Sequence, residues 1–316
     1  MRAWQFTNTH EPLVLADVDE PTAGPGDVII DIRAAGLCHS DVGLMEDEGW
    51  LSLLAKRPIT IGHEIAGVVA ALGDGVTGWA VGDRVGVCPS TAAGAPGYRR
   101  DGGYSFKAAT PAETLVRVPD NVSFALGAVG TDAGMTSHHA VIAKGEVGAG
   151  TKLGIIGLGG LGQIGARVGV LAGAEVYVAE IDEGVWGLAE PLGVRRIAGS
   201  ITEFADVGLD VIVDLAGFGT TTAEAIETVR RGGRVVQVGM GRLEATISTK
   251  ALILRGITLV GSAGGTVDDV AGIYDYFATG QLSPAITEIT FDEIPGGLER
   301  LRRGEVTGRL VAKIAD

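Results

Sequence analysis

The feature that most constrains the fold is a glycine-rich turn, GLGGLG, at residues 157–162. Residues 153–156 form an apolar run that predicts a strand, and residues 160–171 carry apolar residues at helical spacing. Between a strand and a helix, Gly157 permits the tight turn, Gly159 lets the backbone approach a pyrophosphate, and Gly162 allows close helix–strand packing. The helix opens at Gly160 and Leu161, where amide groups and the helix dipole attract phosphate. The turn therefore predicts a dinucleotide site. A packing turn without nucleotide is the alternative.

The predicted nucleotide is NAD rather than NADP. Glu180 follows the next predicted strand, residues 175–179, and lies 18 positions beyond Gly162. A carboxylate there can accept hydrogen bonds from the ribose hydroxyls and would repel a 2′-phosphate. Arginine is absent from the next several positions.

The chain changes character after residue 132. Beyond it, predicted strands alternate with predicted helices, which indicates a parallel, doubly wound sheet. The predicted strands are residues 153–156, 175–179, 210–215, 234–238 and 257–260. The predicted helices are residues 160–171, 221–231 and 267–279. Before it, short strands are separated by glycine and proline turns, and helical periodicity is scarce; examples are 27–33, 65–72 and a hairpin across 73–85. The last ~35 residues, with strands at 288–291 and 310–314, return to this style. We therefore predict an α/β protein with a small β-barrel domain of residues 1–132 and 265–316 and a nucleotide domain of residues 133–264.

Charge and composition exclude several classes of protein. The net charge of 25 − 39 = −14 disfavours nucleic acid as a partner. Two cysteines cannot form a disulfide framework, so a reducing cytoplasm is expected. The N-terminus lacks the apolar core of a signal peptide, and the most apolar stretch is broken by Gln163 and Arg167. No membrane span is therefore expected.

Two short segments of the first domain carry candidate metal ligands. Cys38 lies in GLCHSD at residues 36–41, and His63 in GHE at residues 62–64. A thiolate and an imidazole can hold zinc. Asp41 could orient the imidazole through its free nitrogen, and Glu64 would place a carboxylate near the metal. Taken singly, Cys38 could be a small buried core residue, and His63 could be a hydrogen-bonded histidine with a structural role. Two ligands do not complete a zinc site, so a third must come from elsewhere in the chain.

With these motifs, the chain resembles the zinc-dependent alcohol dehydrogenases of the medium-chain dehydrogenase/reductase superfamily over nearly its whole length. The resemblance implies a GroES-like β-barrel followed by a Rossmann domain. It also implies that Cys38 and His63 hold the catalytic zinc, that Ser40 is the catalytic hydroxyl, and that Glu64 lies behind the histidine. The family's third ligand lies in a motif resembling C-A-G-x-T-x-x-H-A, which reads DAGMTSHHA at residues 132–140. Asp132 therefore replaces the usual cysteine, and carboxylate is an accepted zinc ligand.

The same resemblance implies roles for residues outside the metal site. His39 and Arg309 would face the pyrophosphate, Thr136 the nicotinamide, and Trp50 the substrate pocket. Ordinary alternatives are a helix position for Thr136 and a core position for Trp50. The implied reaction is hydride transfer between NAD and small alcohols, aldehydes or ketones, in a homo-oligomer, either a dimer or a tetramer.

Two departures from the family pattern bear on this reading. Many relatives carry a structural zinc held by four cysteines, but this chain has only Cys88 before the segment 89–103, so we expect one catalytic zinc and no structural one. Many relatives also pass the proton to a histidine at the position of Gly43.

Two other functions remain as alternatives: a zinc-free reductase of quinones or enoyl groups, and a non-catalytic NAD(H)-binding protein. The Cys38/His63 pair argues against the first rival, and Asp132 and Gly43 keep the second open.

Overall fold

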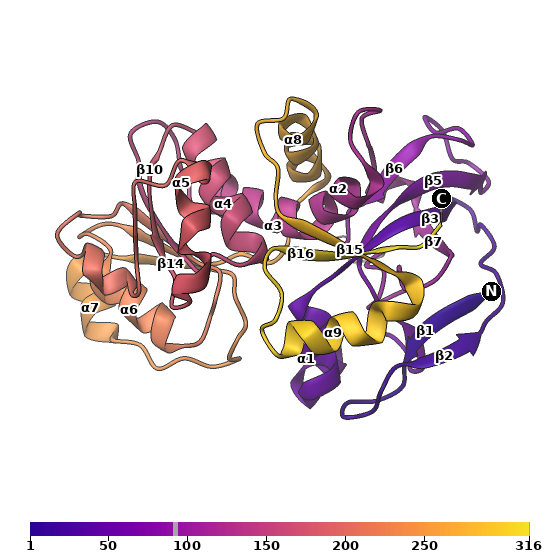
Figure 1. The fold of residues 1–316 in the computed structure, drawn as a ribbon, viewed down its shortest axis with the longest axis horizontal. Coiled ribbons are helices and arrows are strands. Elements are labelled where there is room, and N and C mark those ends of the chain that lie inside the picture. The colour runs from indigo at the N-terminus through magenta and orange to yellow at the C-terminus, as the bar shows by residue number, and fades with distance from the viewer. Residues whose placement is uncertain (91–93, 316) are drawn as a thin grey trace. The chain divides into compact units, whose positions relative to one another are not determined.

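A computed structural model describes residues 1–90 and 94–315 of the chain (Figure 1). The polypeptide forms two compact units. One comprises Met1–Asp132, Thr266–Gly280 and Ala285–Asp316, and the other Ala133–Gly265 and Gln281–Pro284. Within the described ranges, no helix combines the length and apolar character needed to cross a membrane.

The second unit contains a parallel sheet in the order β11-β10-β9-β12-β13-β14. Its strands are β9 (Lys152–Ile156), β10 (Glu175–Ala179), β11 (Arg196–Ala198), β12 (Val211–Asp214), β13 (Arg234–Gln237) and β14 (Thr258–Gly261). Its helices are α3 (Met135–His138), α4 (Gly160–Leu171), α5 (Ala189–Leu192), α6 (Thr220–Thr228) and α7 (Thr249–Arg255). The predicted doubly wound sheet is confirmed. Helix α6 ends earlier than predicted because Val229 adopts ψ 143° and leaves the helix.

In the first unit, the long strand β3 (Asp27–Leu37) is the centre of a mixed sheet. The sheet order is β15-β16-β3-β5-β6-β8, and β7 also pairs with β3; the strands are β5 (Glu64–Leu72), β6 (Arg84–Val87), β7 (Lys107–Pro111), β8 (Leu115–Arg117), β15 (Ile286–Thr290) and β16 (Arg309–Lys313). A smaller sheet has the order β2-β1-β4, from β1 (Arg2–Phe6), β2 (Val14–Asp17) and β4 (Ile59–Thr60). Because β16 runs antiparallel to β3, the C-terminal segment completes the first unit (Figure 1). The predicted GroES-like fold is confirmed.

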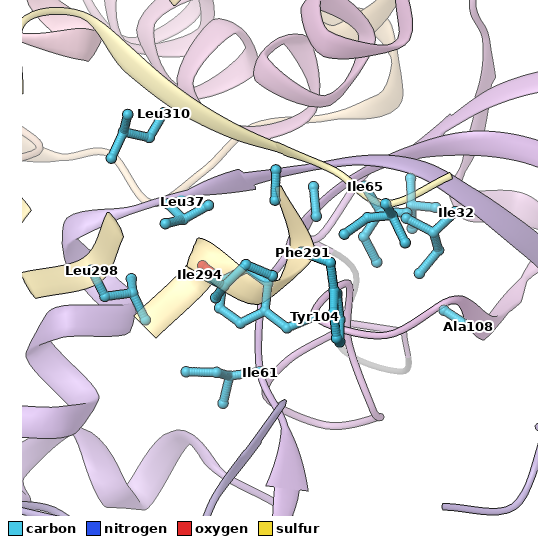
Figure 2. Packing of buried hydrophobic residues seen from close by; sticks show 14 of the residues in the cluster. Ile32, Leu37, Ile61, Ile65, Tyr104, Ala108, Phe291, Ile294, Leu298 and Leu310 are labelled. Atoms are coloured by element: carbon cyan, nitrogen blue, oxygen red, sulfur yellow. The ribbon is translucent and has the colours of Figure 1, made fainter. Parts of the chain in front are cut away.

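The first unit is more helical than its sequence pattern predicted. Its helices are α1 (His39–Glu46), α2 (Phe124–Val129), α8 (Val267–Ala278) and α9 (Ile294–Arg302). Helix α1 escaped prediction because only Asp41, Val42 and Leu44 are buried, which leaves a weak apolar stripe. Helix α9 packs Ile294 and Leu298 into the core beside the phenyl ring of Tyr104 (Figure 2).

Candidate metal centre

Cys38 and His63 come together because they flank two neighbouring antiparallel strands. Cys38 follows the last residue of β3 and caps the start of α1, and His63 immediately precedes β5. Gly36 of β3 pairs with Glu64 of β5, so the end of one strand meets the start of the other. Cys38 and His63 are both buried, with 9% and 4% of their surface exposed.

Asp132 joins them from a π-helical turn, Gly130–Gly134. Its Oδ2 lies 3.6 Å from the Cys38 Sγ and 3.3 Å from the His63 Nε2. One ligand atom from each of Cys38, His63, Glu64 and Asp132 lies within 4.8 Å of the others. Ligands about 2.1 Å from a tetrahedral zinc are separated by about 3.4 Å, so the thiolate, imidazole and carboxylate fit a zinc ion in both spacing and chemistry.

Two buried polar contacts in series lie behind the His63 ring. The Asp41 Oδ1 lies 3.4 Å from the His63 Nδ1, and Tyr104 donates its hydroxyl to the Asp41 Oδ2 at 2.7 Å. This arrangement holds Nδ1 toward the carboxylate and leaves Nε2 facing Asp132. Sequence reasoning missed Tyr104, because nothing local links it to Asp41, 63 positions earlier.

Glu64 forms a buried ion pair with Arg309, which also donates to the Leu37 carbonyl at 3.0 Å. The pair joins β5 to β16, so Arg309 contacts the metal-ligand cluster through Glu64. The remaining oxygen of Glu64, Oε2, has no hydrogen-bond partner among the described residues. Gly36 is required beside it, since a Cβ there would overlap that oxygen. Burial raises the pKa of Glu64, and the Arg309 guanidinium opposes this shift.

Ser40 and Tyr98 also lie close to His63. The Ser40 Oγ is 3.3 Å from the His63 Nε2, and the rings of His63 and Tyr98 are 5.3 Å apart. Trp50, in the short helix Glu48–Leu53, is only 8% exposed and belongs to the core of the first unit. Its indole packs on Gly43, where a Cβ would lie 2.7 Å from the Trp50 Cε2.

In the second unit, the glycine-rich turn joins β9 to α4. Gly157 adopts φ +92°, and a Cβ on Gly162 would overlap the Gly157 carbonyl. A Cβ on Gly159 would meet no described atom within 4 Å, so packing alone does not require a glycine there. The Glu180 carboxylate accepts from the Leu158 N–H at 2.6 Å and therefore lies against this turn.

The residues expected near the cofactor also include positions outside this turn. A cavity of ≈ 300 Å³ lies beyond the carboxyl ends of β12 and β13, where open α/β sheets bind ligands; its lining includes Gly217, Thr222 and Gly239. Thr136 lies in α3 and is 7% exposed, and His39 is exposed at the start of α1.

The family resemblance places a possible structural zinc in the loop of residues 89–103. Residues 91–93 of the predicted 89–103 loop lie outside the described residues. Cys88, immediately before this loop, is a buried thiol outside any disulfide, and burial raises its pKa.

Comparisons with known proteins agree along the whole chain. Residues 24–120 match the alcohol dehydrogenase GroES-like domain, and residues 160–279 match the zinc-binding dehydrogenase family. An alcohol dehydrogenase of Geobacillus stearothermophilus is 29% identical, with all of both chains covered. An NADP-dependent alcohol dehydrogenase C of Mycobacterium bovis is 28% identical, covering 99% of this chain and 98% of the relative.

Solved structures give the same result. Acetophenone reductase from Geotrichum candidum, in complex with NAD, is 30% identical with a TM-score of 0.90, covering 99% of this chain and 97% of that one. An alcohol dehydrogenase from Aeropyrum pernix is 29% identical with a TM-score of 0.91, covering 99% and 100%. The chain therefore belongs to the zinc-type alcohol dehydrogenase family of the medium-chain dehydrogenase/reductase superfamily.

Proposed function

We propose that this protein interconverts alcohols with aldehydes or ketones by hydride transfer to and from NAD, with one zinc ion held by Cys38, His63 and Asp132. The observation that carries the proposal is the buried cluster of thiolate, imidazole and carboxylate, with ligand atoms within 4.8 Å of one another. Glu64 is a candidate fourth ligand through its unpartnered Oε2, or a nearby charge that tunes the site.

In this proposal, zinc supplies a Lewis acid that polarises the substrate oxygen and favours its deprotonation. During alcohol oxidation, Ser40 would accept the proton of the substrate hydroxyl and release its own proton to water; in the reverse reaction it would donate a hydrogen bond to the carbonyl oxygen. Asp41 holds His63 in the tautomer that frees Nε2. Arg309 balances the charge of Glu64, so two ligand charges, those of Cys38 and Asp132, remain to match the metal.

NAD supplies the hydride acceptor. The N-terminus of α4, with Gly159, Gly160 and Leu161, would hold its pyrophosphate, and Glu180 its adenosine ribose. We retain His39 and Arg309 as neighbours of the pyrophosphate, Thr136 of the nicotinamide and Trp50 of the substrate. For Arg309 and Trp50 these roles compete with the ion pair and the core packing described above.

Four further features complete the proposal. One zinc is expected, because Cys88 is a single thiol in the segment that would hold a structural zinc. A homo-oligomer, a dimer or tetramer, is supported by exposed apolar side chains: Ile253 and Leu254 on α7, and Leu259 on the edge strand β14. We also propose a cytoplasmic location and the domain division 1–132 and 265–316 against 133–264.

Elemental analysis combined with a substrate panel tests this function. We expect about one zinc per chain and NAD-dependent oxidation of small alcohols that a chelator abolishes. Cys38→Ala should remove zinc and alcohol oxidation but retain NADH binding. Cys88→Ala is the matched control and should keep both. Zinc-free protein that reduces activated alkenes would instead favour the zinc-free reductase.

A further inference from the structure

The aromatic ring of Tyr104 is fixed against the loop that carries His63. The Tyr104 N–H donates to the Ile61 carbonyl at 3.0 Å. Beside it, the Gly103 N–H donates to the Gly62 carbonyl at 2.7 Å. Gly62 adopts φ +92°, and a Cβ on it would lie 2.5 Å from the Tyr104 Cδ1, so the ring packs directly on this glycine. Since Gly62 immediately precedes His63, the same stretch of backbone supports Tyr104 and the candidate ligand.

The hydroxyl of Tyr104 contacts the segment that carries Cys38. It donates to the Asp41 Oδ2 at 2.7 Å, whereas the Gly36 carbonyl, at 3.5 Å, is the more distant acceptor. The Cys38 N–H donates to the same Oδ2 at 3.1 Å, so Asp41 caps the first turn of α1. The Tyr104 side chain therefore links the two segments from which Cys38 and His63 project.

The two donors on Oδ2 determine the orientation of the Asp41 carboxylate. They direct its other oxygen, Oδ1, toward the His63 Nδ1, which lies 3.4 Å away. Neither of these two atoms has a hydrogen-bond partner elsewhere among the described residues. Asp41 is 1% exposed and Tyr104 is 0% exposed, so water does not reach the carboxylate to replace a lost donor. A buried carboxylate that loses a donor is left undersolvated and is free to turn.

The apolar part of Tyr104 does not need the hydroxyl. The ring lies in the hydrophobic core of the first unit, beside Ile61 and Ile294 (Figure 2). A phenylalanine ring would fill the same space, and a buried hydroxyl is unfavourable unless it is hydrogen-bonded. The specific contribution of the tyrosine is therefore its bond to Asp41.

We propose that Tyr104 is a positioning residue of the metal centre, whose hydroxyl fixes the Asp41 carboxylate so that Oδ1 holds the His63 ring with Nε2 directed to zinc. The proposal rests on the proposed function, in which Cys38 and His63 are zinc ligands. Asp132, the third ligand, comes from a separate segment and lies outside this set of contacts. The Tyr104 hydroxyl thus acts on the cysteine and histidine side of the site.

The zinc affinity of a variant without the hydroxyl tests this role. Tyr104→Phe keeps the ring, and we expect its Kd for zinc, measured in competition with a chelator, to rise about tenfold. Tyr274→Phe is the matched control, because Tyr274 is also buried in the first unit and its hydroxyl donates to the Gly127 carbonyl at 2.8 Å. Each variant loses one buried hydrogen bond, so Tm should fall by a similar amount in both, but Tyr274→Phe should keep the zinc affinity of the unaltered protein.

A double-mutant cycle separates positioning from general damage. In the Asp41→Ala background, Tyr104→Phe should change the Kd for zinc less than twofold, because the carboxylate through which the hydroxyl acts is absent. In cobalt-substituted protein, the visible absorption bands of the metal should shift in Tyr104→Phe and stay unchanged in Tyr274→Phe.

An unchanged Kd for zinc in Tyr104→Phe, or equal losses of zinc affinity with and without Asp41, would overturn the role of Tyr104 and leave the proposed function standing. Unaltered protein that binds no zinc would overturn the proposed function, and this proposal with it.

Discussion

The Asp132 Oδ2 lies 3.3 Å from the His63 Nε2, so a carboxylate lies directly beside the imidazole in the candidate metal site. Asp132→Asn keeps the shape and removes the charge, which leaves the cluster with one anionic ligand fewer. We expect zinc retention to fall at least tenfold in competition with a chelator. Asp132→Cys, which restores the family pattern, should retain zinc. Unchanged zinc content in Asp132→Asn would place Asp132 outside the coordination sphere.

The metal-free protein should respond to pH through His63. Burial opposes protonation of this ring, but the neighbouring charges, including those of Asp41 and Asp132, outweigh it and raise the pKa of His63 well above 6.5. A raised pKa means that protonated His63 stabilises the metal-free fold below about pH 6.5, and that this contribution is lost as pH rises through the raised value. Since zinc requires the neutral imidazole, zinc uptake should release a proton and tighten with rising pH.

Melting curves of metal-free protein between pH 6 and 9 measure the first effect. The difference in Tm between the unaltered protein and His63→Gln should shrink as pH rises. Titration of zinc in buffers of different ionisation enthalpy measures the proton released. A Tm difference that is independent of pH would show that His63 is not protonated in the metal-free fold.

Discrimination between NAD and NADP should depend on Glu180. Its carboxylate lies against the glycine-rich turn through the Leu158 N–H at 2.6 Å, so an added phosphate there would meet a negative charge. Glu180→Ala should narrow the preference for NAD over NADP by about tenfold in kcat/KM. Glu175→Ala, which removes a carboxylate at the other end of β10, is the control and should leave the ratio unchanged. An unaltered ratio in Glu180→Ala would assign discrimination to other residues.

Packing at Gly43 should make even a single methyl group costly. A Cβ there would lie 2.7 Å from Trp50, so Gly43→Ala should lower the free energy of unfolding by about 1–3 kcal/mol. Gly296→Ala, in α9, would meet no described atom within 4 Å and should be neutral or slightly stabilising, because alanine favours helix. Chemical denaturation of both variants measures the difference. A Gly43→Ala variant as stable as Gly296→Ala would show that Trp50 moves aside easily.

The sequence alone predicted the elements whose evidence is local. Helix α4 spans Gly160–Leu171 and strand β10 spans Glu175–Ala179, both as predicted, because apolar periodicity and glycine punctuation are written into consecutive residues. Helices α1 and α9 were missed: α1 has a weak apolar stripe, and α9 lies in a segment read as strand and turn.

Only the tertiary structure could show which distant groups meet around the cluster. Arg309 pairs with Glu64 across 245 positions, Tyr104 donates to Asp41, and the Tyr98 ring packs against His63. Each contact depends on strand pairing and loop placement, and no spacing along the chain records these. The sequence supplied the ligand types and the nucleotide turn; the fold decided the partners of the ligands, because buried charges and hydroxyls are satisfied by whichever groups the packed strands bring within reach.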